Sequence, residues 1–176
     1  MKRYGNLFDR ICDLDNIREA HRNARKGKTG YRSVQRVDAD IERHVLQIRE
    51  LLTTGQYKTA EYRVFERLDN GKRRIIYALP YFPDRIIHHC IMQVVEPIWQ
   101  ATFIRDTYAS MKNRGVHDGV SRIKKALQSD PDGTRYCLKM DVQQFYPSID
   151  HDILKTVVRR KIKDARLLEL LDEIID

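Results

Sequence analysis

Apolar residues recur along the chain at two spacings: every three or four positions in most stretches, and every second position in a few. The wider spacing places apolar side chains on one side of a helix. It spans five stretches: residues 41–52, 87–98, 116–127, 153–158 and 167–175. A shorter apolar stripe lies between residues 7 and 14. The pattern therefore predicts a mostly helical chain.

Two runs with β-strand character interrupt the helical pattern. They are residues 61–68 and 72–79, and Asp69, Asn70 and Gly71 join them. Asn-Gly is a strong hairpin signal, because both residues tolerate a positive φ. The sequence therefore predicts a two-stranded ribbon. Such a ribbon is marginally stable alone, so we expect it to pack on helices or to be held by a ligand.

A further strand is expected at residues 136–141, which read Tyr-Cys-Leu-Lys-Met-Asp. Strand alternation puts the tyrosine, leucine and methionine on one face and Asp141 on the other. The apolar face would join a core, and Asp141 would look into a cleft. An acid at a strand end is also a common turn former or helix cap, so the spacing leaves both roles open.

Length and charge narrow the class of protein. The chain has 176 residues, which suits one domain of ordinary size or an incomplete piece of a larger one. It carries 33 Lys and Arg against 25 Asp and Glu, a net charge of +8, which favours a polyanionic partner. A basic surface that only meets solvent is the alternative.

Cysteine usage and hydropathy bear on the compartment. Cys12, Cys90 and Cys137 lie far apart in apolar contexts, which suggests neither a disulfide framework nor a zinc site. No apolar run is long enough to span a bilayer, and the first residues are not followed by the apolar stretch of a secretion signal. We therefore expect a cytoplasmic protein with no membrane segment.

Four stretches carry a family resemblance: LFDRICDLDNIREAHRNARKGK, GKRRIIYALPYFPDRIIHHCIMQVVEPIW, FIRDTYASMKNRGVHDGV and LKMDVQQFYPSIDHDIL. In content and order they resemble the amino-terminal half of a bacterial reverse transcriptase of the group II intron, retron and diversity-generating retroelement kind. They cover most of the chain. The last stretch is similar to polymerase motif A, and its Asp-x-x-x-Phe-Tyr/Phe-x-Ser-Ile-Asp-His pattern is much more specific than a lone Asp-x-x-x-Phe.

The resemblance implies an α+β fold: right-hand polymerase fingers and a partial palm, mostly helical, with a β-hairpin and a short palm strand. It divides the chain into an amino-terminal helical extension (1–35), fingers (36–135) and the start of a palm (136–176). The implied partners are an RNA template, a DNA primer and a deoxynucleotide (dNTP). Two Mg²⁺ ions would activate the primer 3′-hydroxyl and neutralise the leaving pyrophosphate.

By this resemblance, Asp141 is the catalytic carboxylate and a metal ligand. The backbone carbonyl of Val142 would help to hold one ion. Mg²⁺ prefers hard oxygen ligands and keeps water and phosphate oxygens as further partners, so a carboxylate on a rigid strand is a suitable donor.

The turn after Asp141 would bind the nucleotide through Gln143, Gln144, Phe145 and Tyr146. Its backbone amides would meet the triphosphate. Tyr146 matches the steric gate, a ring beneath the sugar that favours deoxynucleotides, and Phe145 would support it. Membership of the core is the alternative for both rings, and it stays open.

Lys72 and Arg74 share a face of the second ribbon strand and resemble the fingers cations that grip the triphosphate. Arg binds phosphate oxygens in bidentate fashion, which suits this role. A strand that simply presents its charges to solvent is the alternative.

Lys112, Arg114, Gly115 and His117 lie in a segment that resembles a template-contacting, RNA-binding loop. Gly would allow close backbone approach, and the cations would meet phosphates. A plain basic loop is the alternative.

The chain departs from the family in one respect. Polymerases of this kind complete the metal site with a Tyr-x-Asp-Asp motif, and no acid after Asp141 stands in that context. We therefore expect a truncated piece that synthesises no DNA alone and that self-associates through an uncovered palm surface. A non-catalytic nucleic-acid-binding module with the same fold, and a basic helical scaffold for protein partners, are the competing interpretations.

Overall fold

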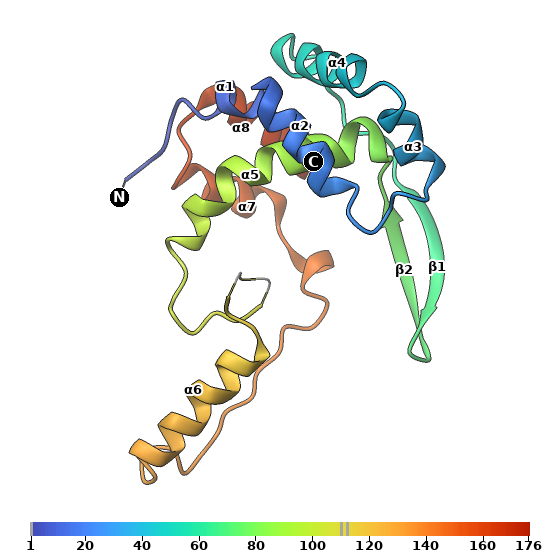
Figure 1. Ribbon diagram of the computed structural model, residues 1–176. Helices are drawn as coiled ribbons and strands as arrows, with labels where there is room; N and C mark the ends of the chain where they lie inside the picture. Colours follow the sequence, from blue (N-terminus) through green and yellow to red (C-terminus); the bar gives the residue numbers. More distant parts are fainter. Residues whose placement is uncertain (1, 110, 112) are drawn as a thin grey trace. The chain divides into compact units, whose positions relative to one another are not determined.

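The chain forms two compact units in the computed structural model (Figure 1). The structure describes residues 2–109, 111 and 113–176. The first unit combines residues 1–96 with 151–176, and the second is residues 97–150. The first unit is therefore built from both ends of the sequence, with the second inserted between them.

Helices dominate the first unit. In chain order they are α1 (Phe8–Ile11), α2 (Leu14–Ala24), α3 (Arg32–Asp38), α4 (Ile41–Thr53), η1 (Tyr81–Arg85), α5 (Ile86–Gln100), α7 (His151–Arg159) and α8 (Ala165–Ile175). The turn η1 is kinked at Phe82, whose backbone is extended, and the last four residues of α5 belong to the second unit. Aspartates cap three of them: Asp13 accepts from the backbone N–H of Asp15 at 2.9 Å, Asp40 from that of Arg43 at 3.2 Å, and Asp164 from that of Leu167 at 3.2 Å. Such caps satisfy N–H groups that have no partner within the helix.

The core of the first unit draws on both ends of the sequence. Ile17, Ile48, Ile87, Ile162 and Leu167 each expose at most 1% of their surface. The first three of these residues lie on α2, α4 and α5, and Leu167 lies on α8. Burial of these side chains removes apolar surface from water and is the main stabilising contribution to the unit.

The predicted ribbon is confirmed. Strands β1 (Arg63–Asp69) and β2 (Lys72–Ala78) pair antiparallel, with Asp69 opposite Lys72 at the turn end. Asn70 and Gly71 have φ angles of 50° and 77°, the left-handed conformation that a two-residue hairpin turn requires. Most residues of both strands are exposed.

The second unit contains helix α6 (Val116–Ser129) and the short 3₁₀ helix η2 (Tyr146–Ser148). All five sequence stretches with helical spacing thus lie on helices, and the prediction of a mostly helical α+β chain is confirmed. The apolar stripe of α6 is exposed, however, with Ile123 at 61% and Leu127 at 50%.

The predicted palm strand at residues 136–141 is wrong. These residues adopt no regular secondary structure, and Tyr136, Leu138 and Met140 expose 79–90% of their surface instead of joining a core. A strand requires a neighbour that takes up its backbone N–H and C=O groups. Within the described ranges the named strands all belong to the β1–β2 ribbon, so this segment has no such neighbour. The assignment of fingers and palm stays a prediction.

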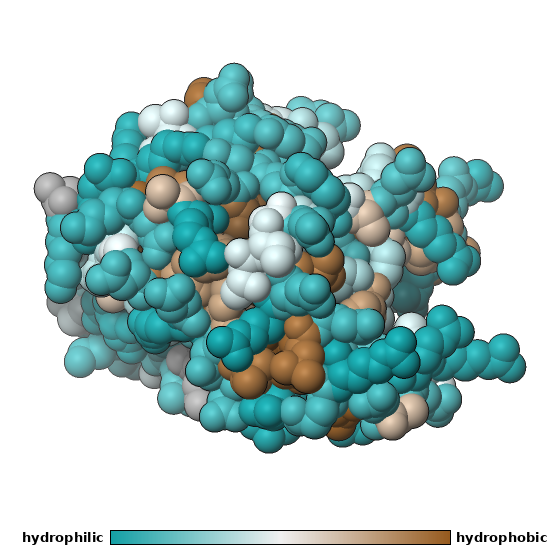
Figure 2. Space-filling view, turned by 90° about the horizontal axis from the view of Figure 1, so that it is seen from above, coloured by the Kyte–Doolittle hydropathy of each residue, from teal (hydrophilic) through white to brown (hydrophobic). Residues whose placement is uncertain are grey.

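The surface is mostly hydrophilic in the view of Figure 2, with hydrophobic side chains gathered in patches between the polar ones. No helix among the residues that the structure describes is long and apolar enough to cross a membrane.

Candidate nucleotide and nucleic-acid site

One face of the ribbon collects positive charge. Directly opposite residues of an antiparallel pair share a face, and the register pairs Arg67 with Arg74, Asp69 with Lys72 and Arg63 with Ala78. Lys72 and Arg74 therefore lie beside Arg63 and Arg67. We call these four cations, with Phe65 between them, the basic ribbon face.

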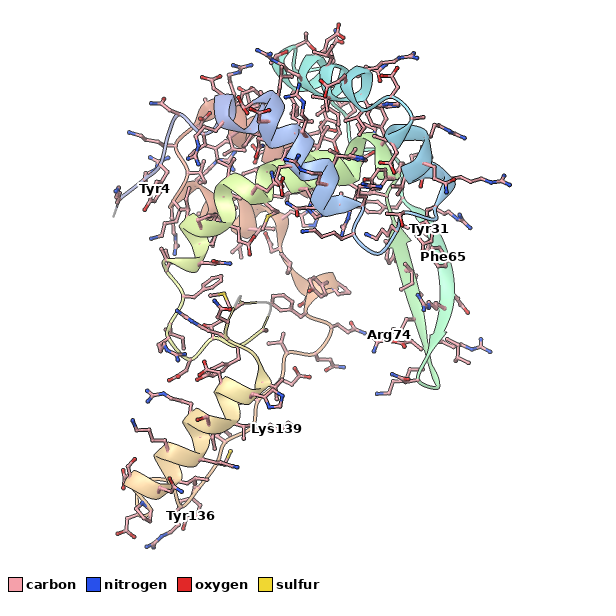
Figure 3. The ribbon with its side chains drawn as sticks, in the orientation of Figure 1. Tyr4, Tyr31, Phe65, Arg74, Tyr136 and Lys139 are labelled. Atoms are coloured by element: carbon pink, nitrogen blue, oxygen red, sulfur yellow. The ribbon has the colours of Figure 1, made fainter. Side chains whose placement is uncertain are left out.

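The basic ribbon face is open to solvent and carries little compensating charge. Its single acid is Asp69, whose Oδ2 lies 3.1 Å from Nε of Arg74. The guanidinium of Arg63 lies over the Phe65 ring, 5.4 Å from its centroid. Figure 3 shows Phe65 near the root of the ribbon and Arg74 nearer its turn. Exposed guanidinium and ammonium groups along a strand can bind successive phosphates.

Two pockets flank the end of the ribbon that joins the helices, near Arg63 and Ala78, which we call its root. The first, about 630 Å³, is lined by residues that include Tyr31, Arg36, Arg63 and Phe65, together with the acid Glu61. The second, about 510 Å³, is lined chiefly by tyrosines and bases: Tyr31, Tyr62, Tyr77, Tyr81, Lys28 and Arg85. Aromatic rings beside cations are suited to stack bases and bind phosphates.

Arg63, Arg67 and the root tyrosines were missed by sequence reasoning. Arg63 and Arg67 join the basic ribbon face through the pairing of β1 with β2. That register follows from the Asn-Gly turn, so extending the predicted hairpin residue by residue would have found both arginines. Tyr31 comes from the connection before α3, and no local signal places it at the ribbon root.

Asp141 lies in the second unit, in an exposed segment without regular structure. The turn after it is well defined. Gln144 has a φ of 49°, its carbonyl accepts from the backbone N–H of Ser148 at 3.0 Å, and the Phe145 carbonyl accepts from the Ser148 hydroxyl at 2.9 Å. A carboxylate next to a fixed turn is accessible to a cation, and it does not cap a helix by any hydrogen bond of the described residues.

The aromatic pair of this turn is exposed. Phe145 and Tyr146 expose 53% and 83% of their surface, and their rings meet edge to face with centroids 5.3 Å apart. Neither ring is therefore a core residue within the second unit. Both rings, together with Gln143 and Gln144, are presented to solvent.

The donor set suits Mg²⁺ in kind but not in number. Asp141 and the carbonyl of Val142 carry the hard oxygen atoms that Mg²⁺ prefers, and their role as ligands stays a prediction. No group of three or more His, Cys, Asp or Glu that could hold a metal ion exists within the described part of the chain. A site for two Mg²⁺ ions would therefore need further carboxylates beside Asp141.

The predicted template loop is braced against α6. Lys112 lies outside the described residues. Arg114 donates from Nη1 to the carbonyl of Arg105 at 3.3 Å, Gly115 is the residue before α6, and His117 is exposed in the first turn of that helix.

Ion pairs and a ring contact fix this brace. Arg105 pairs with Asp118 at 3.2 Å, and Arg122 with Asp106 at 3.1 Å. The Tyr108 hydroxyl, which donates to Asp106 at 2.7 Å, and Arg122 hold the pKa of that carboxyl below its usual value. The Tyr108 ring packs on Gly119, where an added Cβ would lie 3.4 Å from the ring.

The predicted site residues fall into two groups. Lys72 and Arg74 belong to the first unit, whereas Asp141, the turn 143–146 and the loop 113–117 belong to the second. Each group is well defined within its own unit. That the two groups share one cleft stays a prediction.

The chain is similar to several known proteins. Over 127 residues, 70% of this chain and 33% of the relative, it is 32% identical to Protein YkfC of Escherichia coli. It is 27% identical over 109 residues to Nuclear intron maturase 1, mitochondrial, of Arabidopsis thaliana, covering 61% of the chain and 15% of that protein. It is 24% identical over 135 residues to Group II intron-encoded protein LtrA of Lactococcus lactis, covering 76% of the chain and 22% of that protein.

No protein-family model matches the chain. The chain spans a third or less of the length of each of these relatives. The similarity to a maturase and to a group II intron-encoded protein agrees with the resemblance carried by the four sequence stretches. The chain is a homologue of group II intron maturases and of the intron-encoded protein LtrA, as the sequence predicted.

Proposed function

We propose that the chain is the fingers and early palm of an RNA-directed DNA polymerase, which binds an RNA template, a DNA primer and a dNTP. The observation that carries the proposal is the basic ribbon face, in a homologue of intron maturases. Four cations on one exposed face, with one acid among them, form a surface suited to polyphosphate.

The ribbon contributes charge and the pockets at its root contribute stacking surface. Lys72 and Arg74 grip the triphosphate of the nucleotide, and Arg63 and Arg67 extend the cationic strip toward the root. Phosphate neutralisation by such cations releases counterions and makes binding depend on salt. Tyr31, Tyr62 and Tyr77 at the root offer rings for unpaired bases.

The segment around Asp141 supplies the chemistry in this proposal. The Asp141 carboxylate and the Val142 carbonyl hold Mg²⁺, and bound Mg²⁺ supplies charge neutralisation at the reacting phosphate. Gln143 and Gln144 orient the triphosphate, and the exposed Tyr146 ring, supported by Phe145, lies under the sugar. Arg114, Gly115 and His117 contact the template. Because one carboxylate does not complete a two-ion site, the chain alone transfers no nucleotide.

The proposal is tested by titrating the chain into fluorescently labelled single-stranded RNA at several salt concentrations. We expect the logarithm of affinity to fall linearly with the logarithm of salt. The double variant Lys72→Ala/Arg74→Ala should bind more weakly, with a slope shallower by roughly 0.7 for each phosphate that these side chains no longer neutralise.

A matched control removes the same charge elsewhere. Arg43 and Arg49 are exposed on α4, and Arg43→Ala/Arg49→Ala changes the net charge equally. We expect this variant to bind RNA nearly as the unmodified chain does. An equal loss of RNA affinity in both double variants would show that binding depends only on net charge, and it would count against the ribbon site.

A non-catalytic nucleic-acid-binding module is the second candidate, and the exposed basic ribbon face favours it, because that surface can bind phosphates without a metal ion. Binding of a labelled dNTP with and without Mg²⁺ separates the two. The polymerase proposal expects Mg²⁺-dependent dNTP binding that Asp141→Asn weakens. The module expects RNA binding that Asp141→Asn leaves unchanged and no Mg²⁺-dependent dNTP binding.

A further inference from the structure

The ribbon is exposed on both faces, so its direction depends on the two segments that join it to the helices. On one face are the cations described above, and on the other Val64, Leu68 and Ile75 expose 54–70% of their surface. Two-stranded ribbons bend and twist readily when nothing packs on them. What holds the ribbon's roots therefore decides where the cations lie.

The outgoing root, after β2, is anchored by a buried tyrosine. The Tyr81 hydroxyl shares a hydrogen bond of 2.9 Å with Nδ1 of His21 on α2. The other ring nitrogen of His21 lies 2.8 Å from Oδ1 of Asp38 on α3. This chain of hydrogen bonds, in which Tyr81 and His21 are buried and Asp38 is partly exposed, fixes the start of η1 to two helices.

The incoming root, before β1, is anchored by Asp84, which lies three residues after Tyr81. The Tyr57 hydroxyl donates to Oδ1 of Asp84 at 2.9 Å, and the backbone N–H of Ala60 donates to the same oxygen at 3.0 Å. Asp84 itself is fully buried, at 0% exposure. A single carboxylate oxygen on the outgoing root thus binds two donors of the incoming root.

Burial of this carboxylate costs free energy, so the side chain does more than fill space in the core. Within the described residues its second oxygen, Oδ2, is buried without a hydrogen-bond partner, as is Nε2 of His88 one helical turn later. An apolar side chain of similar size would fill the space without this desolvation penalty. What an apolar residue cannot do is accept from Tyr57 and Ala60 at once.

We propose that Asp84 is a positioning residue: it cross-links the two roots of the ribbon and so sets the direction in which the basic ribbon face is held. Its effect on phosphate binding rests on the function proposed above, whereas its effect on the ribbon does not. Glu173 on α8 is the competing anchor, because it accepts from the backbone N–H of Thr59 at 3.1 Å and pairs with Lys58 at 2.6 Å.

The test measures the ribbon's direction by pulsed electron paramagnetic resonance between two spin labels. The full chain with Cys137→Ser carries labels at Leu68→Cys on the ribbon and Glu50→Cys on α4, both exposed positions. We expect one narrow distance distribution. Asp84→Leu, which removes the acceptor at similar volume, should broaden it. Asp84→Asn, whose amide oxygen can still accept from both donors, should keep it narrow.

A milder variant and a rival variant complete the design. Tyr57→Phe removes one of the two donors and should broaden the distribution less, and it remains informative if Asp84→Leu does not fold. Glu173→Ala should broaden the distribution less than Asp84→Leu does. A distribution that stays narrow in Asp84→Leu or in Tyr57→Phe, or that broadens only in Glu173→Ala, would overturn the proposal.

Binding of labelled RNA to the same variants, without spin labels, links direction to function. Asp84→Leu should weaken binding about tenfold, equivalent to about 1.4 kcal/mol, with Asp84→Asn close to the unmodified chain. If the unmodified chain binds no RNA, the proposed function fails, and the distance measurement still decides the role of Asp84. If RNA binds and the distances broaden without weaker binding, ribbon direction does not control affinity and that part of the proposal is refuted.

Discussion

Asp164 accepts a hydrogen bond from the backbone N–H of Leu7, at 2.7 Å, although 157 positions separate the two residues. The same oxygen accepts from the N–H of Phe8 at 3.0 Å, and the other carboxylate oxygen caps α8 through the N–H of Leu167 at 3.2 Å. Close by, Tyr4 exchanges backbone hydrogen bonds with Lys161 and Lys163. One side chain therefore starts two helices and joins the two sequence ends of the first unit.

Replacement of Asp164 should destabilise the first unit. In Asp164→Ala three backbone N–H groups lose their acceptor, and loss of a helix cap alone typically costs about 0.5–2 kcal/mol. We expect a loss of about 2 kcal/mol or more in the free energy of unfolding, measured by urea denaturation. Glu50→Ala, an exposed acid on α4, is the control and should change stability little. Equal stability of the two variants would contradict the role of Asp164.

Stability should also depend on pH through this carboxyl group. Burial by itself raises the pKa of Asp164, but hydrogen bonds from the N–H groups of Phe8, Leu7 and Leu167 outweigh burial and lower it. The pKa is therefore lower in the folded than in the unfolded chain. The resulting stabilisation is fully present when the pH is above the pKa of Asp in the unfolded chain, about 3.9. It is lost as the pH falls through the lower pKa of the folded chain.

Asp164→Asn isolates this effect, because an amide does not titrate. The difference in unfolding free energy between the unmodified chain and this variant should be largest near neutral pH and should shrink below about pH 4. Urea denaturation at several pH values measures it. A difference that does not change with pH would show that the charge of Asp164 is immaterial.

The three cysteines should react at very different rates. Burial raises the pKa of Cys12 to about 11 and that of Cys90 to about 12, and both thiols are buried, whereas Cys137 is exposed. The reactive species is the thiolate, and it must also be accessible. A coloured thiol reagent should therefore label Cys137 rapidly in the folded chain and all three in urea. Rapid labelling of Cys137→Ser would contradict the buried placement of the other two.

The exposed stripe of α6 should cause self-association. Val116, Ile123 and Leu127 expose at least half of their surface, and the neighbouring segment exposes Leu138 and Met140. Contiguous apolar surface of this kind favours association. We expect sedimentation velocity to show concentration-dependent oligomers that Ile123→Glu reduces. Lys124→Ala, on the same helix, should leave them unchanged. A monomer at every concentration tested would refute this expectation.

Local signals in the sequence predicted the local structure. The Asn70–Gly71 turn fixes the ribbon because both residues adopt the required positive φ, whatever surrounds them. Helix α4 follows from its apolar spacing and its cap at Asp40. These features depend on neighbours within a few positions, which a single sequence displays directly.

Features that depend on distant partners were not predictable in the same way. The alternation at Tyr136, Leu138 and Met140 is real, but a strand also needs a neighbouring strand, and the sequence does not display that neighbour. The four stretches that resemble reverse transcriptases agree with the relatives that were found. The double anchor at Asp84, by contrast, joins residues 24 and 27 positions apart and leaves no periodic pattern in the sequence.

The order of the two units along the chain has a consequence for synthesis on the ribosome. Ile162 and Leu167 complete the core that residues 1–96 begin. A nascent chain that has emerged only as far as α6 therefore carries an unfinished apolar core on its amino-terminal part. Domains generally fold as units during translation. Here the core of the first unit is complete only after α7 and α8 have been synthesised, and the whole second unit is translated before them.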